Sequence, residues 1–272
     1  MTSLPTTILF IGDISGKPGR RAVSKLLDPL RDRCAADLVI ANAENAAGGI
    51  GLTKPTAKEL LDAGIDVITL GNHAFAKRDI HPMLDQEPRI IRPANYPVGV
   101  PGRGWGEYEA RRGRRVTVIN LVGRVFMNPV DCPFACANSI LAGLPEETRT
   151  VVVDMHAEAT SEKMAMGWHL DGRVSAVIGT HTHIQTSDER VLPHGTAYLT
   201  DAGMTGVHDS VLGLDKDAVL EKFLLQIPGR FEVAEGEATL QGVVLTIDPQ
   251  SGRALDIQRI SVRESDVTVQ SW

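Results

Sequence analysis

The feature that most constrains the fold is a repeated alternation of short apolar runs and amphipathic stretches near the start of the chain. The apolar runs, rich in β-branched residues, occupy residues 7–12, 37–42 and 66–71. Helical patterns follow the first two, at 20–35 and 53–64, where Thr53 is a candidate N-cap and Gly64 a candidate stop. This alternation predicts βαβ units on a buried, largely parallel sheet.

The same reading extends to the rest of the chain with one interruption. We expect further strands at residues 115–123, 150–156 and 174–183, with a helix at 157–170. Residues 238–247 and 254–262 alternate in polarity on either side of a turn, which is typical of an antiparallel hairpin. The interruption is the segment 88–145, which is rich in Pro and Gly, so it is expected to be irregular outside its strand.

Composition narrows the class of protein. The chain has 272 residues, of which 43% are hydrophobic and 23% charged, so we expect one domain over residues 1–272. The net charge of −6 argues against a stable nucleic-acid complex. No apolar run approaches the roughly 20 residues of a membrane span, and the N-terminus lacks secretory-signal features, so we expect a cytoplasmic protein without membrane contact.

The cysteines fit this compartment. Cys34, Cys132 and Cys136 are too few and too unevenly spaced for a disulfide framework, and reduced thiols are expected. Cys132 and Cys136 offer two thiolates but no second pair nearby, which disfavours a structural zinc site.

Metal-binding side chains follow nearly every expected strand. They are Asp13, Glu44, Asn45, Asn72, His73, His156, His181 and His183. In open α/β sheets the carboxyl ends of the strands line one crevice, where ligands bind. Segments far apart in the sequence would therefore deliver these side chains to one place.

Each of these residues alone has an ordinary structural explanation. Asp13 would more often cap a helix, and His156 would more often be a hydrogen-bonded interior group. His181 and His183 are a stronger signal, because residues i and i+2 of an extended segment point the same way. Together the strand ends favour one shared site over coincidence.

The donor set points to two metal ions. Roughly six or seven oxygen and nitrogen donors are too many for one tetrahedral zinc, and without thiolates they suit Mn, Fe or Zn. Two divalent ions against Asp13 and Glu44 leave a positive centre, which suits an anionic phosphate ester. Such pairs, about 3.5–4 Å apart, activate water for in-line displacement.

The motifs resemble a known family. "GD", "NAEN", "GNH", "MHAE" and "GTHTHIQTSDERVLPHGTAYLTDAGMTG" follow the order of the calcineurin-like metallophosphoesterase superfamily, and the long last stretch resembles its bacterial YmdB-like branch. The resemblance implies a four-layer α/β/β/α sandwich, with two mixed β-sheets packed face to face and helices outside. It also implies a dinuclear iron or manganese centre and a phosphodiesterase acting on 2′,3′-cyclic and, as a further candidate, 3′,5′-cyclic nucleotides.

The resemblance assigns roles residue by residue. The first ion would be held by Asp13, Glu44, Asn45 and His183. Glu44 would bridge to the second ion, completed by Asn72, His156 and His181. His73 matches the catalytic histidine, and our hypothesis makes it the general acid that protonates the departing ribose oxygen while a metal-bridging hydroxide attacks phosphorus.

Two departures from the wider superfamily stand out. Its first motif usually ends in histidine, whereas this chain has Ser15, so Asn45 is the expected substitute ligand. An acidic residue often follows the catalytic histidine, whereas this chain has Ala74, which leaves open what orients His73. Gly71, just before them, is expected to let the chain turn.

Other roles stay open at this level. The alternatives are a phosphomonoesterase acting on nucleotides or phosphoproteins, or a metal-stabilised nucleotide-binding regulator. The substrate pocket is expected from residues 92–107 and 124–140, and a homo-oligomer is compatible with the sequence. Candidate supporting groups are Thr182, Gln185, Asp201 and His208, candidate surface or structural histidines are His169 and His194, and candidate base-stacking rings, for which core packing is favoured, are Phe126 and Phe134.

Overall fold

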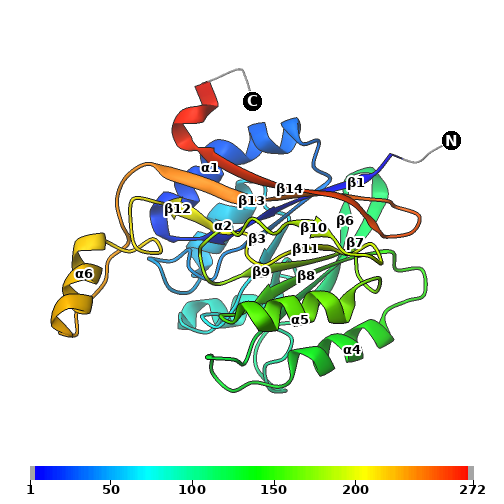
Figure 1. Ribbon diagram of the computed structural model, residues 1–272, viewed down its shortest axis with the longest axis horizontal. Helices are drawn as coiled ribbons and strands as arrows, with labels where there is room; N and C mark the ends of the chain where they lie inside the picture. Colours follow the sequence, from blue (N-terminus) through cyan, green and yellow to red (C-terminus); the bar gives the residue numbers. More distant parts are fainter. Residues whose placement is uncertain (1–3, 269–272) are drawn as a thin grey trace.

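Two β-sheets form the centre of the computed structural model, which describes residues 4–268 (Figure 1). The first sheet has the order β2-β12-β13-β1-β3-β4-β5, with β14 beside β13. Its strands are β1 (Thr6–Ile11), β2 (Asp13–Ile14), β3 (Leu38–Asn42), β4 (Val67–Thr69), β5 (Ile90–Ile91), β12 (Met204–Val207), β13 (Ala238–Ile247) and β14 (Ala254–Arg263). Parallel pairing of β1, β3, β4 and β5 and antiparallel pairing of β1 with β13 make this sheet mixed.

The second sheet has the order β10-β11-β9-β8-β7-β6. Its strands are β6 (Trp105–Ala110), β7 (Arg114–Val122), β8 (Thr150–His156), β9 (Ala176–Thr180), β10 (Arg190–Val191) and β11 (Ala197–Leu199). Strands β7, β8, β9 and β11 are parallel, and the edge strands β6 and β10 are antiparallel to their neighbours, so this sheet is mixed too.

Helices cover the outer face of each sheet. They are α1 (Gly16–Arg33), α2 (Lys54–Asp62) and α3 (His81–Gln86) on the first sheet, and α4 (Pro133–Gly143) and α5 (Thr160–Leu170) on the second, with short 3₁₀ turns at Arg78–Ile80, Arg111–Gly113 and Glu264–Thr268. One apolar cluster lies under α1 and α2, a second between the sheets, and a third under α4 and α5. The predicted four-layer sandwich is confirmed.

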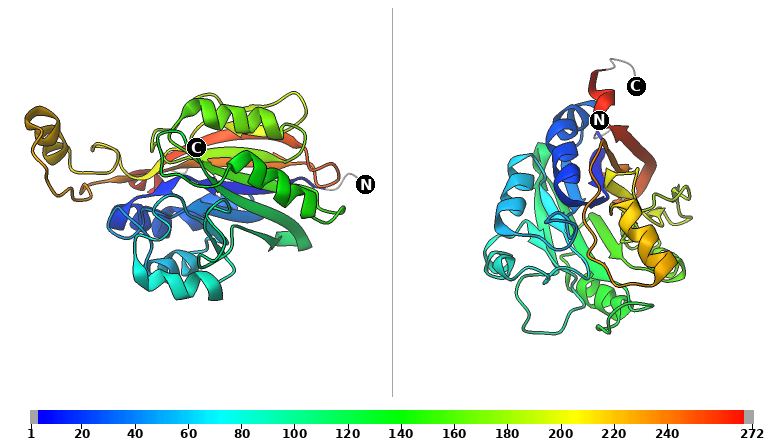
Figure 2. Two further views of the ribbon diagram at one scale, coloured as in Figure 1. Left: turned by 90° about the horizontal axis from the view of Figure 1, so that it is seen from below. Right: turned by 90° about the vertical axis from the view of Figure 1, so that its left-hand side faces the viewer.

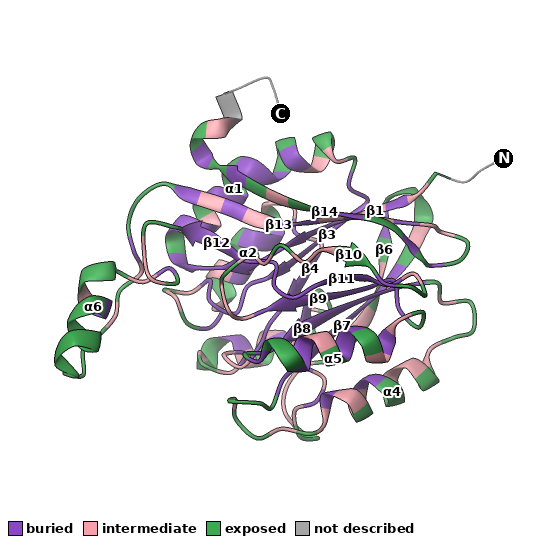
Figure 3. Cartoon of the chain, in the orientation of Figure 1, coloured by how far each residue is buried: buried purple, intermediate pink, exposed green. Residues whose placement is uncertain are grey.

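The alternation of β1 shows how the sequence builds these layers. Leu9 and Ile11 belong to the cluster under the helices, whereas Ile8 and Phe10 belong to the cluster between the sheets. Successive side chains of a strand point to opposite faces, so a strand covered on both sides must be apolar at every position. The central strands β3, β4, β8 and β9 are accordingly buried at every position, whereas β6, β10 and β14 carry exposed side chains (Figure 3).

Several local predictions hold. Thr53 caps α2: its side chain accepts from the Thr56 backbone, and the Thr56 side chain accepts from the Thr53 backbone. Gly64 follows the helix with φ of +105°, which favours glycine. The C-terminal hairpin is present as the antiparallel pair β13 and β14.

The segment 88–145 is more regular than predicted. Pro133 begins α4, as proline often does at the first helical position, and this signal was missed. Edge strand β6 was missed because most of its side chains are at least partly exposed, which weakens the apolar pattern. The predicted strand at 174–183 stops at Thr180, so β9 is shorter than expected.

One element departs from the layers. Helix α6 (Lys216–Leu225) projects away from the rest of the molecule in Figure 1 and in the left view of Figure 2. Its residues are mostly exposed, including Leu220, Phe223 and Leu224, which are 51%, 71% and 79% exposed. These apolar side chains recur at helical spacing, yet they face solvent.

Candidate metal centre

All seven predicted metal ligands lie at the carboxyl edge of the strands, joined by a continuous chain of contacts. Glu44, Asn45 and Asn72 follow β3 and β4, His156 ends β8, and Asp13 opens β2. The contacts that link the set run from His156 to Glu44, Asn72 and His181, from the His181 backbone to Asp13, and from His183 to Asn45 and Asp13. The convergence inferred from the parallel topology therefore exists in the structure.

The first half of the site is centred on the Nε2 atom of His156. Three acceptors surround this nitrogen: Glu44 Oε1 at 2.9 Å, Asn72 Oδ1 at 3.0 Å and His181 Nδ1 at 3.1 Å. Ligand atoms of Glu44, His156 and His181 all lie within 4.8 Å of one another. Four electron-pair donors that meet at one buried point are suited to a divalent cation.

The histidines are oriented by partners on their outer sides. Each outer ring nitrogen faces an acceptor, so it can carry the hydrogen and leave a lone pair on the inward nitrogen. The pairs are His156 Nδ1 with Thr180 Oγ1 at 2.9 Å, His181 Nε2 with Glu158 Oε2 at 3.1 Å, and His183 Nδ1 with the Leu212 carbonyl at 3.0 Å. All three imidazoles are arranged as metal ligands usually are.

A buried carboxylate fixes the ring of His156. Asp154 accepts from the Thr180 hydroxyl at 2.6 Å, so the Thr180 oxygen is left to accept from His156 Nδ1. Asp154 also accepts from Thr69 at 2.5 Å and from Asn42 at 3.1 Å. Burial nevertheless raises the pKa of Asp154 to about 6. Sequence analysis did not single out Asp154, although it lies two residues before His156 and points to the same side of the strand.

The second half of the site contains an unpaired buried oxygen. Asp13 Oδ1 is fully buried and has no hydrogen-bond partner, while Oδ2 accepts from the His181 backbone at 3.0 Å. His183 Nε2 lies 3.7 Å from Oδ1, too far for a hydrogen bond. A buried carboxylate oxygen without a partner is costly, and a cation between it and His183 would satisfy both atoms. The donors fit a second ion here.

The close approach of these charged groups shifts their pKa values. Burial opposes charge on His156, but Glu44 and Asp13 outweigh it and raise the pKa of His156 to about 9. Burial likewise opposes charge on Glu44, but His156 and His73 lower the pKa of Glu44 to about 2. Burial and the charge of His156 lower the pKa of His181 to about 3. Without ions, a proton therefore sits between the acceptors around His156 Nε2.

His73 lies beside two of the proposed metal ligands, Glu44 and Asn45. Its backbone N–H donates to Glu44 Oε2 at 2.7 Å, and its Nδ1 lies 3.2 Å from Asn45 Oδ1. Ala74 is buried in the apolar cluster under α1 and α2. The neighbour that orients His73 is therefore Asn45, which sequence analysis could not identify.

Gly71 is required for a different reason than predicted. Its φ is not positive, so its backbone does not need the freedom of glycine. A Cβ atom at this position would lie 2.3 Å from the ring of His156 and 2.5 Å from Glu44 Oε2. The glycine makes room for two proposed ligands.

The argument that placed His181 and His183 on an extended segment was wrong. Both residues lie beyond β9 with left-handed backbones, at φ of 101° and 64°. They still reach the site, but the loop has to hold them in conformations that side-chain-bearing residues seldom adopt.

The remaining candidates divide by their contacts. Gln185 donates to three backbone carbonyls and His208 contacts the Met204 carbonyl, so these supporting groups are structural. His169 and His194 contact Asn138 and Asp171 at the surface, as expected. The three cysteines are free thiols.

The two candidate aromatic rings differ. Phe134 packs against the third apolar cluster, as favoured. Phe126 was wrongly expected in the core: it is 88% exposed, with a left-handed backbone at φ of 62°. It follows β7 in a loop whose amides at Arg124 and Val125 donate to Glu162. The Gly123 amide at the start of this loop donates to the His156 carbonyl at 2.9 Å, so the loop begins beside the proposed ligand His156.

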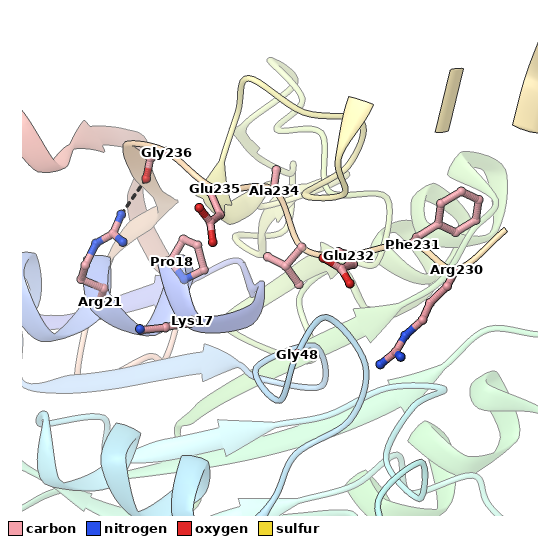
Figure 4. Close-up of a pocket in the computed structure, with 11 residues that line it drawn as sticks. Lys17, Pro18, Arg21, Gly48, Arg230, Phe231, Glu232, Ala234, Glu235 and Gly236 are labelled. Atoms are coloured by element: carbon pink, nitrogen blue, oxygen red, sulfur yellow. Dashed lines mark hydrogen bonds between the residues drawn. The ribbon is translucent and has the colours of Figure 1, made fainter. Parts of the chain in front are cut away.

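A cavity of about 530 Å³ lies between the start of α1 and residues 230–236, which follow α6 in the chain (Figure 4). Lys17, Arg230 and Phe231 line it together with Glu232 and Glu235. Because both basic groups (Lys17, Arg21 and Arg230) and acidic groups (Glu232 and Glu235) line it, the cavity does not favour an anion strongly, and none of the predicted ligands lines it.

Comparison with known proteins identifies the family. The model of the YmdB-like protein family matches residues 9–260. The chain belongs to the YmdB-like family. A Bacillus subtilis member, a 2′,3′-cyclic-nucleotide 2′-phosphodiesterase, is 48% identical over 257 residues, which are 94% of this chain and 97% of the relative. The predicted family is thereby confirmed.

Solved structures agree. A hypothetical protein from Thermus thermophilus matches with a TM-score of 0.89 and 42% identity, over 95% of this chain and 99% of that chain. A phosphatase from Mycoplasma pneumoniae matches with a TM-score of 0.90 and 31% identity, over 97% and 95%. Within residues 4–268, no helix is long and apolar enough to cross a membrane.

Proposed function

We propose that this chain is a metal-dependent phosphodiesterase that hydrolyses 2′,3′-cyclic nucleotides. The observation that carries the proposal is the convergence of three acceptors on His156 Nε2 beside the unpaired Asp13 Oδ1. This donor set suits two adjacent divalent cations, and the name of the Bacillus relative supports the substrate class. The cyclic 3′,5′-nucleotides are the second substrates to test.

The two ions would share one carboxylate. Glu44, whose Oε1 lies 2.9 Å from His156 Nε2, would bridge the two halves of the site, and the ligands of the first ion would be Asp13, Glu44, Asn45 and His183. Those of the second ion would be Glu44, Asn72, His156 and His181. When bound, the ions would supply Lewis-acid activation of a water molecule and neutralise phosphate charge. Oxygen and imidazole donors without thiolate favour Mn or Fe, with Zn as a further option.

His73 would act as the proton donor to the leaving ribose oxygen. One end of the Asn45 amide faces His183 Nε2 and the other faces His73 Nδ1. Which end carries the oxygen would be set by the cation, because only the oxygen can bind it. If Asn45 offers its oxygen to an ion, its Nδ2–H donates to His73 Nδ1. The His73 proton then resides on Nε2, on the side away from Asn45, where a leaving group can accept it.

The test is a turnover panel with the manganese-loaded protein. Bis-p-nitrophenyl phosphate and 2′,3′-cyclic nucleotides should be hydrolysed much faster than p-nitrophenyl phosphate. A preference for the monoester would instead support the phosphatase alternative. Tight binding of cyclic nucleotides without turnover would support the nucleotide-binding regulator and would overturn the proposal.

Location and assembly stay predictions. A cytoplasmic compartment follows only from sequence composition. A homo-oligomer is compatible with the sequence, and the exposed apolar stripe of α6 is a candidate surface for it. Sedimentation of the purified protein would measure the oligomeric state.

A further inference from the structure

The loop that carries His181 and His183 is held by a charged pair in the interior. Thr182, between the two histidines, donates to Asp201 Oδ2 through its backbone N–H at 3.1 Å and its hydroxyl at 2.8 Å. The same oxygen accepts from Lys163 Nζ at 2.6 Å. Lys163 and Asp201 are 1% and 0% exposed in their side chains, so this pair is shielded from water.

Further contacts close the loop over Asp201. The Gly203 amide donates to Asp201 Oδ1 at 2.9 Å. The Asp201 backbone N–H donates to the Thr186 hydroxyl at 3.0 Å, and the Thr186 N–H donates to the Asp201 carbonyl at 3.2 Å. Residues 182 and 186 are thus fastened to one aspartate on either side of His183.

The fold makes specific room for the lysine. Lys163 reaches Asp201 from α5, passing β9 at Gly179. A Cβ atom at Gly179 would lie 2.9 Å from Lys163 Cδ and 1.8 Å from the Thr200 carbonyl oxygen. Apolar side chains fill such interior space at lower desolvation cost, so a buried ion pair is weak support for stability alone.

The backbone conformation of this loop explains why it needs the contacts between Thr182 and Asp201. Both histidines adopt left-handed conformations that are unfavourable for residues with a Cβ atom. Only strong local interactions keep such residues in place, and the double donation from Thr182 to Asp201 lies between them.

We infer that Lys163 and Asp201 are positioning residues of the metal centre, which hold His181 and His183 in ligating orientation through Thr182. The inference rests on the proposed metal site. Neither residue touches substrate, so their effect reaches the reaction through metal binding.

The experiment measures Mn²⁺ binding by calorimetry and by metal content after dialysis. Lys163→Met and Asp201→Asn should weaken Mn²⁺ binding by about 10- to 100-fold, as loss of outer partners of metal ligands does. Thr182→Val, which keeps the N–H and loses the hydroxyl, should weaken it by less, about threefold to tenfold on the same scale. Thr182→Ser should restore wild-type binding.

The matched control is Asp37→Asn. Asp37 is also a buried carboxylate in an ion pair, with Arg112, but it precedes β3 at the opposite edge of the sheet. This variant should lose thermal stability and keep wild-type Mn²⁺ affinity. Thr182→Val and Thr182→Ser keep the test valid if Lys163→Met or Asp201→Asn does not fold.

The outcomes separate the two proposals. If Lys163→Met, Asp201→Asn and Thr182→Val bind Mn²⁺ as tightly as the wild type, whatever their stability, the pair is only structural and the inference is overturned. If the wild-type protein itself binds no Mn²⁺, the metal site of the proposed function fails, and this inference fails with it.

Discussion

Two groups of proposed ligands reach the same point by different means. Glu44, Asn72 and His156 lie at or just after strand ends, where sheet pairing sets their positions. His181 and His183 lie on a left-handed loop beyond β9, where sheet pairing has ended. Pairing within a parallel sheet positions the residues at its edge, whereas the loop that carries the two histidines is held by the contacts of Thr182 with Asp201.

The strand-end group gives the largest expected effect. Glu44→Gln removes the charge that both ions would share, so kcat/KM should fall by about 10³-fold or more, with loss of bound metal. Activity assays and elemental analysis measure this. The control is Glu264→Gln, because Glu264 is also a buried glutamate but pairs with Arg21 away from the site. Retention of both ions in Glu44→Gln would contradict the bridging role.

His73 follows β4 at the same edge but is not expected to ligate. His73→Ala should lower kcat by about 100- to 1,000-fold, because general acid catalysis typically contributes that much. Metal content should stay near that of the wild type. His169→Ala, at the surface, should be fully active. A His73→Ala protein that loses metal would move His73 into the ligand set.

The strand-end ligand His156 and the loop ligand His181 should differ in whether they release a proton when an ion binds. The pKa of His156, raised to about 9, means that its proton is bound below that pH and must leave when an ion binds. His181, with a pKa lowered to about 3, has no proton to lose near neutrality. Mn²⁺ affinity should therefore rise by about tenfold per pH unit from pH 6.5 to 8.5. Calorimetry in buffers of different ionisation enthalpy counts the proton, and an affinity independent of pH would sink this assignment.

Phe126 is a third left-handed residue that follows a strand at this edge. Its exposure and the loop start beside His156 suit it to stack on a nucleobase. Phe126→Ala should raise KM for cyclic nucleotides by about fivefold to tenfold, and leave KM for bis-p-nitrophenyl phosphate unchanged. Phe223→Ala, on α6, is the matched exposed phenylalanine. Equal effects on both substrates would argue against base stacking.

The positions of the strand-end ligands could be predicted from the sequence, whereas the conformation of the loop that carries His181 and His183 could not. Strand-end positions such as Asn72 and His156 were readable, because apolar runs and their ends are local signals. The conformation of His181 and His183 was not readable, because it depends on a contact between Thr182 and Asp201, which is 19 residues further along the chain. The orientation of His73 by Asn45 likewise crosses two strand ends. Such pairings are tertiary and leave no periodic pattern.

The most direct measurement is anomalous diffraction from crystals of the manganese-loaded protein. Two peaks about 3.5–4 Å apart are expected, with Glu44 between them. One peak should lie against His156 Nε2 and His181 Nδ1, and the other against Asp13 Oδ1 and His183 Nε2. A single peak, or peaks away from Glu44, would contradict a dinuclear centre bridged by Glu44.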